Sequence, residues 1–403
     1  MPCALYAKNA GINLTSGEGI VVKDQMISAK PNSPIWNSNS IQNEKVSGLK
    51  PNVGDVLVYD GMQWTPSNQK CVPAGTGILS FNSKAPEGFK YSGSSIVTNK
   101  LSGAWNEVAP MDISRRFSAT CEYNGKLYVF GGEDEQVHCS THAHVYDPVT
   151  NKWTNLNPMP VGRVSSAAVE LNGLIYISGG ILSSENYGSK RVDVYNPSTN
   201  TWSAHEPMNN GRFAHSLFSF NNKLFAVGGT LQASTTIVSQ TIEEYDFDLK
   251  KWTVLYTIPN FYHSTTSTIL NGVIYFVNGY NDANDLRTYS YSLITKEWEA
   301  YDELNTPRAN MAMGTIGGYI VVAGGRDLER NPLDCTEIFS TESQSWMPTE
   351  ALLKEASYGL RGVEVNGKFI VVGGQGGLGF KFYTTQCLTL QEVQQKVFLH
   401  NSK

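Results

Sequence analysis

The first hundred residues of this 403-residue chain contain no arginine, and no apolar run anywhere approaches the ~20 residues that a membrane-spanning helix needs. The amino terminus has neither the basic start nor the long apolar stretch of a secretion signal. The six cysteines are scattered without disulfide or metal spacing, which predicts reduced thiols and synthesis in a cytosol. The formal net charge of −5 excludes a globally basic nucleic-acid binder. We therefore expect neither a membrane span nor a nucleic-acid partner.

Catalytic signatures are also missing. There is no nucleophile elbow or zincin helix motif, and the glycine-rich run 373–377 ends a predicted strand and opens no helix, so we expect no phosphate binding there. Only His138, His142 and His144 cluster, with Cys139 between them. His142 and His144 would share one face of a strand, and Cys139 could add a third metal ligand, but no fourth ligand stands at a fixed spacing. We predict a polar loop here, no metal, no cofactor and no enzyme.

What the chain does contain is an internal repeat. Six tryptophans recur at intervals of 46 to 50 residues, namely Trp105, Trp153, Trp202, Trp252, Trp298 and Trp346. Five are preceded, seven residues earlier, by an aromatic residue: Tyr146, Tyr195, Tyr245, Tyr291 and Phe339. A fixed period of this length indicates one supersecondary unit copied several times.

Each copy also carries a glycine pair at the end of a short apolar run. The pairs are Gly131 and Gly132, Gly179 and Gly180, Gly228 and Gly229, Gly324 and Gly325, and Gly373 and Gly374. An arginine opens the strand before most pairs: Arg116, Arg163, Arg212, Arg308 and Arg361. In the fourth copy the pair becomes Asn278 and Gly279, and Tyr262 and His263 stand near the place of the arginine. Each copy therefore contains about four short β-runs separated by turn signals, with no helical periodicity.

The glycine pair, the tyrosine seven residues before the tryptophan and the following arginine resemble the kelch-repeat β-propeller family over residues 101 to 390. The resemblance implies an all-β fold with six blades, in which Trp and Tyr pack between blades. Two ring closures stay open. In the simpler one, the strand around Trp105 completes the last blade. In the other, residues 396–399 form its outer strand and Trp105 lies on an extra edge. We assign residues 101–403 to the propeller.

Residues 1–100 form a different segment, rich in Asn, Ser, Gly and Pro, with β-signals at 19–23 and 55–60. Residues 34–42 and 53–66 are similar to segments of phage tail-fibre and giant-virus fibre proteins, and 77–91 resembles the entry of collar-type fibre modules; the alternative is a low-complexity β-rich linker. Such short strands gain stability by association. We expect a small β-rich attachment segment that binds a scaffold or identical chains.

The loops between the second and third strands of each copy are expected to emerge on the same face as the connections between copies, and they vary while the strands do not. They span 133–143, 181–190, 230–240, 280–287, 326–334 and 375–380. We predict that this face binds a protein or glycan receptor. The candidate binding residues are Glu133, Asp134, Glu135, His138, Tyr187, Asp282, Asp285, Arg287, Arg326, Asp327, Arg330 and Gln375.

Three functions remain open. The first is a structural attachment protein on a virion or fibre surface, favoured by the β-like amino-terminal segment. The second is an intracellular, cytoplasmic kelch adaptor or effector that mediates protein–protein interaction, as in ubiquitin-ligase substrate receptors. The third is a sugar-modifying propeller enzyme.

Overall fold

The computed structural model describes residues 102–390, except 184, 233–236, 259–265 and 278–285, together with the backbone of strands in the two terminal regions. The chain divides into two compact units, Gly103–Leu390 and Met1–Ser102 with Gln391–Lys403. The described residues form strands and turns and no helix, which confirms the all-β class. None of them lies in a helix that could cross a membrane.

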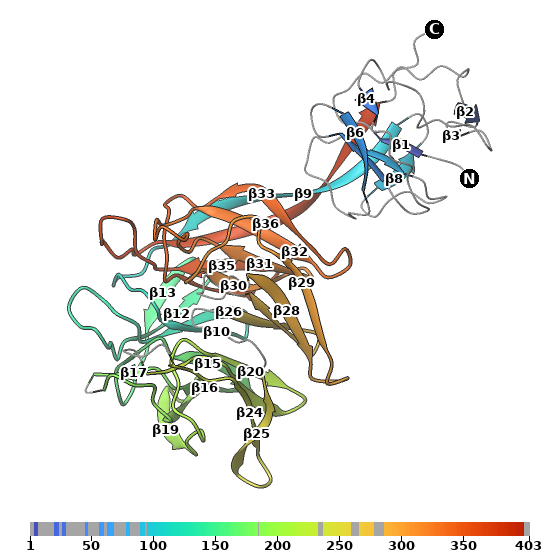
Figure 1. Ribbon diagram of the computed structural model, residues 1–403. Coiled ribbons are helices and arrows are strands. Elements are labelled where there is room, and N and C mark those ends of the chain that lie inside the picture. The colour runs from blue at the N-terminus through green and yellow to red at the C-terminus, as the bar shows by residue number, and fades with distance from the viewer. Residues whose placement is uncertain are drawn as a thin grey trace. The chain divides into compact units, whose positions relative to one another are not determined.

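Six antiparallel sheets form the blades of a propeller, five with four strands each and the sixth with five (Figure 1). The first is β10 (Ala119–Tyr123), β11 (Lys126–Phe130), β12 (Ala143–Asp147) and β13 (Lys152–Asn155). The second is β15 (Ala167–Leu171), β16 (Leu174–Ser178), β18 (Val192–Asn196) and β19 (Thr201–His205). The third is β20 (Ser216–Phe220), β21 (Lys223–Val227), β24 (Thr241–Asp246) and β25 (Lys251–Thr257). The fourth is β26 (Thr266–Leu270), β27 (Val273–Val277), β28 (Arg287–Ser292) and β29 (Trp298–Glu303). The fifth is β30 (Ala312–Ile316), β31 (Tyr319–Ala323), β32 (Cys335–Ser340) and β33 (Ser345–Leu352).

The sixth blade settles how the ring closes. Its order is β34 (Arg361–Val365), β35 (Lys368–Val372), β36 (Thr385–Phe398) and β9 (Ser95–Val108), with β8 (Phe89–Ser92) beyond. Trp105 lies in β9, so closure by the strand around Trp105 is confirmed. The alternative, an outer strand at 396–399, is wrong because β36 continues as one strand to Phe398 and does not turn back.

The propeller also contains two short two-stranded ribbons. In one, β14 (Arg163–Val164) pairs with β17 (Ile181–Leu182), and in the other, β22 (Thr230–Gln232) pairs with β23 (Ile237–Val238).

In the other unit, five strands pair in the order β1 (Ala4–Tyr6), β7 (Ile78–Ser80), β5 (Val56–Tyr59), β6 (Gln63–Ser67) and β4 (Lys45–Val46). A hairpin joins β2 (Ile20–Lys23) and β3 (Met26–Ala29). The β-signals expected at 19–23 and 55–60 are therefore strands.

The periodic aromatic residues are structural. In five blades each tryptophan is the direct cross-strand partner of the aromatic seven residues before it, as Tyr245 is of Trp252. Their ring centroids are 5.3 Å apart, and Trp252 is almost fully buried. The Trp252 Nε1–H donates to the backbone oxygen of Glu206 in the connection from the preceding blade, at 3.1 Å. These pairs contribute apolar burial, and the indole N–H groups of Trp153, Trp202, Trp252 and Trp346 each donate a hydrogen bond.

The glycine pairs exist because neighbouring blades approach closely there. All the described glycine pairs have positive φ angles. A Cβ on Gly373 would lie 2.1 Å from the carbonyl oxygen of Arg115, and one on Gly131 would lie 2.5 Å from that of Arg163, each in the neighbouring blade. The Gly132 N–H donates to the carbonyl oxygen of Arg163 in the next blade at 2.9 Å. A side chain at these positions would separate the blades.

Four arginines are buried between the blades, each sixteen residues before the first glycine of a pair and donating to its carbonyl oxygen. They are Arg115, Arg163, Arg212 and Arg308. Three of them form ion pairs with a buried carboxylate on the third strand: Asp193, Glu243 and Glu337 respectively. In these three blades the carboxylate and the hydrogen-bond acceptors compensate for the hydration that the buried guanidinium has lost.

Two of the arginines in the repeat pattern do not occupy this buried position. In the first blade it is Arg115, and not Arg116, that donates to the glycine carbonyl. In the sixth blade Arg361 begins β34 instead, and Ser357 stands sixteen residues before Gly373. That blade also has Gln386 at the position where the fifth blade has Glu337. Each directly follows the third-strand residue that makes the last pair with the second strand, Thr385 and Thr336 respectively. In the sixth blade, therefore, both the arginine and its counter-ion are absent.

The first blade replaces the carboxylate by a histidine. Arg115 Nη2 lies 2.8 Å from His144 Nδ1, and His144 Nε2 lies 2.9 Å from Asp112 Oδ1. Burial and, second, the charge of Arg115 lower the pKa of His144 to about 4. The ring is therefore neutral at pH 7, with Nδ1 accepting from Arg115 and Nε2–H donating to Asp112.

Candidate functional site

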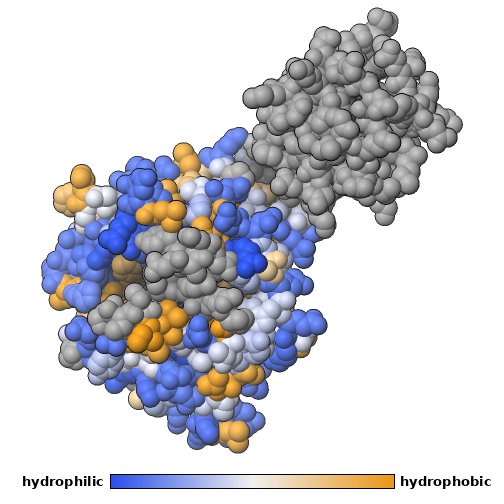
Figure 2. Space-filling model, in the orientation of Figure 1, coloured by the Kyte–Doolittle hydropathy of each residue, from blue (hydrophilic) through white to orange (hydrophobic). Residues whose placement is uncertain are grey.

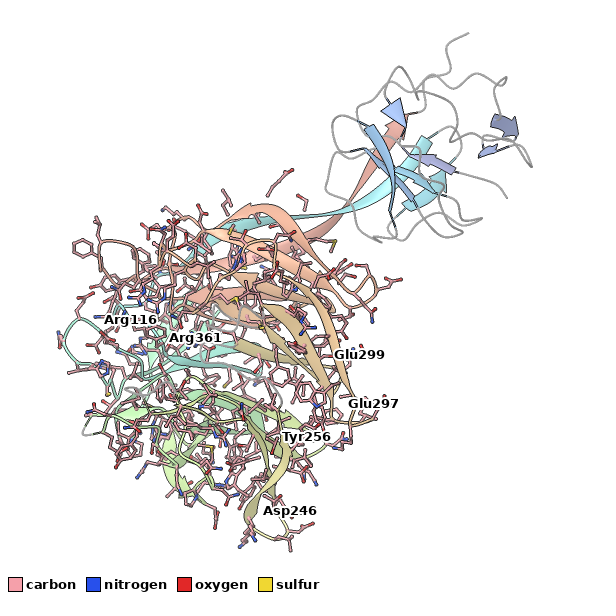
Figure 3. The ribbon with its side chains drawn as sticks, in the orientation of Figure 1. Arg116, Asp246, Tyr256, Glu297, Glu299 and Arg361 are labelled. Carbon is pink, nitrogen blue, oxygen red and sulfur yellow. The ribbon has the colours of Figure 1, made fainter. Side chains whose placement is uncertain are left out.

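The loops between second and third strands emerge at the same end of the propeller as the connections between blades, as expected. Isolated β-bridges join the two sets of segments within a blade, as Arg116 does with Glu133 and Tyr358 with Gln375. Figure 3 shows Arg116 and Arg361 near this end, while Asp246 and Glu297 lie opposite, by the turns between third and fourth strands. We call the end formed by these loops and connections the loop face.

A ring of backbone hydrogen bonds supports the loop face. One residue of each described connection adopts a left-handed conformation, with φ between 49° and 71°: Phe117, Ser165, Ala214, Asn310 and Gly359. The N–H of Gly359 donates to Asn310, that of Phe117 to Gly359, that of Ser165 to Phe117 and that of Ala214 to Ser165, at 2.7 to 2.9 Å. The equivalent part of the fourth blade lies outside the described residues. Four of the five residues are not glycine, so the ring offsets a conformational cost of about 1 kcal/mol at each.

Arginine and aromatic side chains alternate beside this ring. Phe117 lies between two guanidinium groups, with the Cζ of Arg116 at 5.2 Å and that of Arg361 at 5.6 Å from its ring centroid. Tyr358 likewise lies between Arg326 at 5.3 Å and Arg116 at 6.0 Å. We call these five residues the axial cluster. Of them, only Arg326 was among the predicted binding residues, because Arg116 and Arg361 were noted only as arginines that open a strand of the repeat.

The predicted loop residue Glu133 is occupied by contacts within the chain. Its Oε2 accepts hydrogen bonds from Arg116 Nε at 3.1 Å and Nη2 at 2.8 Å, and lies 3.3 Å from His138 Nδ1. Its Oε1 lies 3.3 Å from Lys381 Nζ. Burial alone would raise the pKa of Glu133, but the hydrogen bonds and charges of Arg116 and Lys381 lower it below its usual range. Glu133 therefore holds the first and sixth blades together on the loop face.

Three further predicted residues also have partners within the chain. Asp134 is buried, and its Oδ1 accepts the backbone N–H of Gln136 and of Val137, both at 2.8 Å, which caps a turn. Glu135 is exposed and accepts the N–H of Lys381 at 3.3 Å. Gln375 accepts a hydrogen bond from Arg116 Nη1. These contacts stabilise the loops.

The fifth blade contributes Arg326, Asp327 and Arg330. Asp327 accepts from the backbone N–H and the side-chain Nδ2 of Asn331 at 2.8 and 3.1 Å, which shapes the loop. Arg330 is exposed at the loop tip with a φ of 70°. Arg326 is half-buried in the axial cluster. The structure thus brings Glu133, His138, Gln375 and Arg326 to one region and leaves Arg330 apart.

The remaining predicted residues are more dispersed. Tyr187 is exposed and lines an open depression of about 450 Å³ with Lys190, Asn210 and Leu231. Arg287 begins β28 and lies over the ring of Tyr289, with its Cζ 5.2 Å from the centroid. Asp282 and Asp285 lie outside the described residues.

Apart from Tyr187, the exposed apolar side chains on the loops were missed in the sequence analysis. Leu378 is 89% exposed, Phe380 69% and Leu328 61%. Further exposed apolar residues on this face are Val137, Tyr187, Ile237 and Tyr383. Figure 2 shows apolar residues as separate spots among polar ones on the visible face. Their signal was present in the loop sequences, but charge patterning drew the prediction to residues that turn out to bind one another.

The histidine and cysteine cluster does not converge. His142 Nδ1 lies 2.7 Å from Ser140 Oγ, His144 is buried against Arg115, and Cys139 Sγ donates to the carbonyl oxygen of Ile181 at 3.3 Å. Within residues 102–390, apart from the gaps given above, no group of three His, Cys, Asp or Glu side chains is placed to hold a metal ion. Cys121, Cys139, Cys335 and Cys387 are free thiols.

Comparison with protein families identifies the repeat. Residues 95–279 match the KLHDC2/KLHL20/DRC7 Kelch-repeats domain, and residues 307–350 match the Kelch motif. The blades are kelch repeats. The propeller is also similar to the solved structure of YjhT, with a TM-score of 0.61 and 16% identity over 70% of this chain and 99% of that one, which shows the fold alone.

Curated relatives contain the same kind of repeat. The chain is 31% identical over 150 residues to F-box/kelch-repeat protein SKIP11 of Arabidopsis thaliana, covering 36% of this chain and 32% of the relative. It is 27% identical over 116 residues to Kelch-like protein 21 of Danio rerio, covering 28% of this chain and 18% of the relative. The matched region thus spans a third or less of these relatives. The comparisons give no support to the fibre-type resemblance of residues 34–91.

Proposed function

We propose that the kelch propeller is the protein-binding module of an adaptor, and that the loop face binds its partner. The observation that carries the proposal is the group of exposed apolar loop tips, above all Leu328, Leu378 and Phe380, on a face whose blade connections are joined by four consecutive backbone hydrogen bonds. Exposed apolar side chains on a rigid surface are typical of protein interfaces, where a few of them provide most of the binding energy.

The relatives favour an adaptor over a fibre-surface attachment protein. Two of them are named F-box/kelch-repeat protein and Kelch-like protein, after the same repeat that forms this propeller, and neither name refers to a virion or a fibre. We therefore prefer the adaptor hypothesis to the attachment role that the amino-terminal pattern suggested. We further propose that residues 1–100 join the chain to a scaffold or to identical chains, which light scattering on the full chain tests.

The test selects binding peptides from a random display library on the full chain. The loop-face variant carries Leu328→Ser, Leu378→Ser and Phe380→Ser. The matched control carries Val149→Ser, Leu249→Ser and Ile294→Ser, which are equally exposed apolar residues on the turns at the opposite end. Thermal unfolding checks that both variants fold.

We expect the selected peptides to lose at least tenfold in affinity for the loop-face variant and to bind the control variant like the original chain, as measured by biolayer interferometry. Equal binding to all three proteins, or an equal loss in both variants, would contradict the proposal.

A further inference from the structure

Arg361 occupies a position that is small in every other blade. It is the first residue of the innermost strand and pairs with the last residue before the glycines. The residues in the same register are Ala119, Ala167, Ser216, Thr266 and Ala312. The repeat therefore needs only a small side chain here, and the arginine of the sixth blade serves no role that the other five blades require.

Arg361 and Arg326 also lack the counter-ions that this chain gives to its other enclosed arginines. Arg361 Nη1 donates to the carbonyl oxygen of its neighbour Leu360 at 3.0 Å, and its guanidinium faces Phe117. Arg326 faces Tyr358 and the side-chain amide of Asn310, whose oxygen accepts from it at 3.1 and 3.2 Å. Among the described residues, no carboxylate lies within ion-pair distance of either.

Nearby negative charge is already used. Glu133 is the carboxylate of this region, and it is shared by Arg116, Lys381 and His138. By contrast, Arg163, Arg212 and Arg308 each have a carboxylate of their own. The axial cluster therefore carries an excess of positive charge within a chain whose net charge is −5.

An enclosed cation without a partner costs folding free energy. Arg361 keeps some contact with solvent, but the surrounding protein lowers its pKa to about 10. Such a group destabilises the fold but is suited to binding. A guanidinium held against an aromatic ring presents its free N–H groups in the fork geometry that matches a carboxylate.

Building on the proposed function, we propose that Arg361 and Arg326 bind a carboxylate side chain of the partner protein. The partner segment then carries an aspartate or glutamate that reaches the axial cluster, flanked by apolar residues that contact the loop tips. Charge complementarity decides the occupant, since the cluster offers aromatic faces and two guanidinium groups without a carboxylate partner among the described residues. The apolar tips Leu328, Leu378 and Phe380 lie on loops of the fifth and sixth blades, which also supply Arg326 and Arg361.

The test measures fluorescence anisotropy of two labelled octapeptides on the full chain, one alternating Glu and Leu and the other alternating Gln and Leu. We expect the Glu peptide to bind at least tenfold tighter. Arg361→Gln and Arg326→Gln should each remove most of this preference, and Arg361→Lys should recover part of it. Arg330→Gln is the matched control, because it removes the same charge from an exposed tip of the same loop as Arg326 and should change nothing.

Three results overturn the inference. One is that neither peptide binds. A second is that millimolar inorganic phosphate displaces the Glu peptide as effectively as millimolar free glutamate does, which would make this a general anion site. The third is that both peptides bind equally, and if the loop-face variant then loses both, the proposed function stands while the carboxylate receptor fails.

Discussion

Replacing the buried Arg212 by methionine should strongly destabilise the propeller. Arg212 is fully buried and connects three parts of the third blade. Its Nη1 donates to the carbonyl oxygen of Gly228 at 2.8 Å, and its Nη2 donates to Thr241 Oγ1 at 3.1 Å and pairs with Glu243. Methionine fills a similar volume, so the change removes charge and hydrogen bonds more than packing.

The magnitude follows from what is left behind. Glu243 is also fully buried. Without Arg212, the hydrogen bonds left to its carboxylate among the described residues come from the backbone N–H groups of Asn209 and Asn210 and from the side-chain amide of Asn210, at 2.9 to 3.2 Å. Removing one partner of a buried ion pair costs about 3 to 5 kcal/mol. We expect a loss near 3 kcal/mol because these N–H groups remain.

Arg361→Met is the matched comparison. Arg361 has no carboxylate partner among the described residues, and burial lowers its pKa to about 10. Removing it should therefore cost less than about 1 kcal/mol, or should raise stability.

Urea unfolding followed by tryptophan fluorescence and circular dichroism measures both free energies. The reasoning is refuted if Arg212→Met costs less than about 1 kcal/mol, or if Arg361→Met costs as much as Arg212→Met.

Three further predictions concern the repeat. Trp252→Ala should cost about 3 to 5 kcal/mol through an unfilled cavity between blades, and Trp202→Ala less because Trp202 keeps solvent contact; equal losses in urea unfolding would contradict this. Gly373→Ala should lower the melting temperature far more than Gly317→Ala, because both have positive φ but only at Gly373 does the new Cβ meet a backbone oxygen; similar melting temperatures would refute the role of close approach. The pKa of His144 is lowered from 6.5 to about 4, so between these pH values the unfolded chain binds a proton that the folded chain does not bind. The contribution of the neutral His144 ring to the free energy of unfolding is therefore complete above pH 6.5 and is lost as the pH falls towards 4, by roughly 3 kcal/mol. His144→Gln should flatten this part of the curve of unfolding free energy against pH, and an unchanged slope would contradict the assignment.

The sequence by itself determined the repeat, and it left two ring closures open until the strand order of the sixth blade decided between them. Positive φ and close backbone approach leave glycine as the residue that fits at Gly373 and Gly374, so the pairs mark where the second strand of a blade ends. The spacing of seven residues between Tyr245 and Trp252 places them opposite each other across a short hairpin. Such signals are local in the chain, and a residue pattern can therefore record them.

Only the tertiary structure decided which arginines belong to the core and which to the site. Arg115 and Arg116 are adjacent, and a one-residue difference in register sends one between blades and the other to the loop face. The sequence showed Arg361 only as an arginine that opens a strand, and the structure adds that it pairs with no carboxylate among the described residues. The charges of Glu133 and Asp134 were expected to face a ligand, but they bind groups that are distant in sequence or in their own turn. Whether a charge is free or paired depends on partners that folding brings together, so composition and spacing do not contain that information.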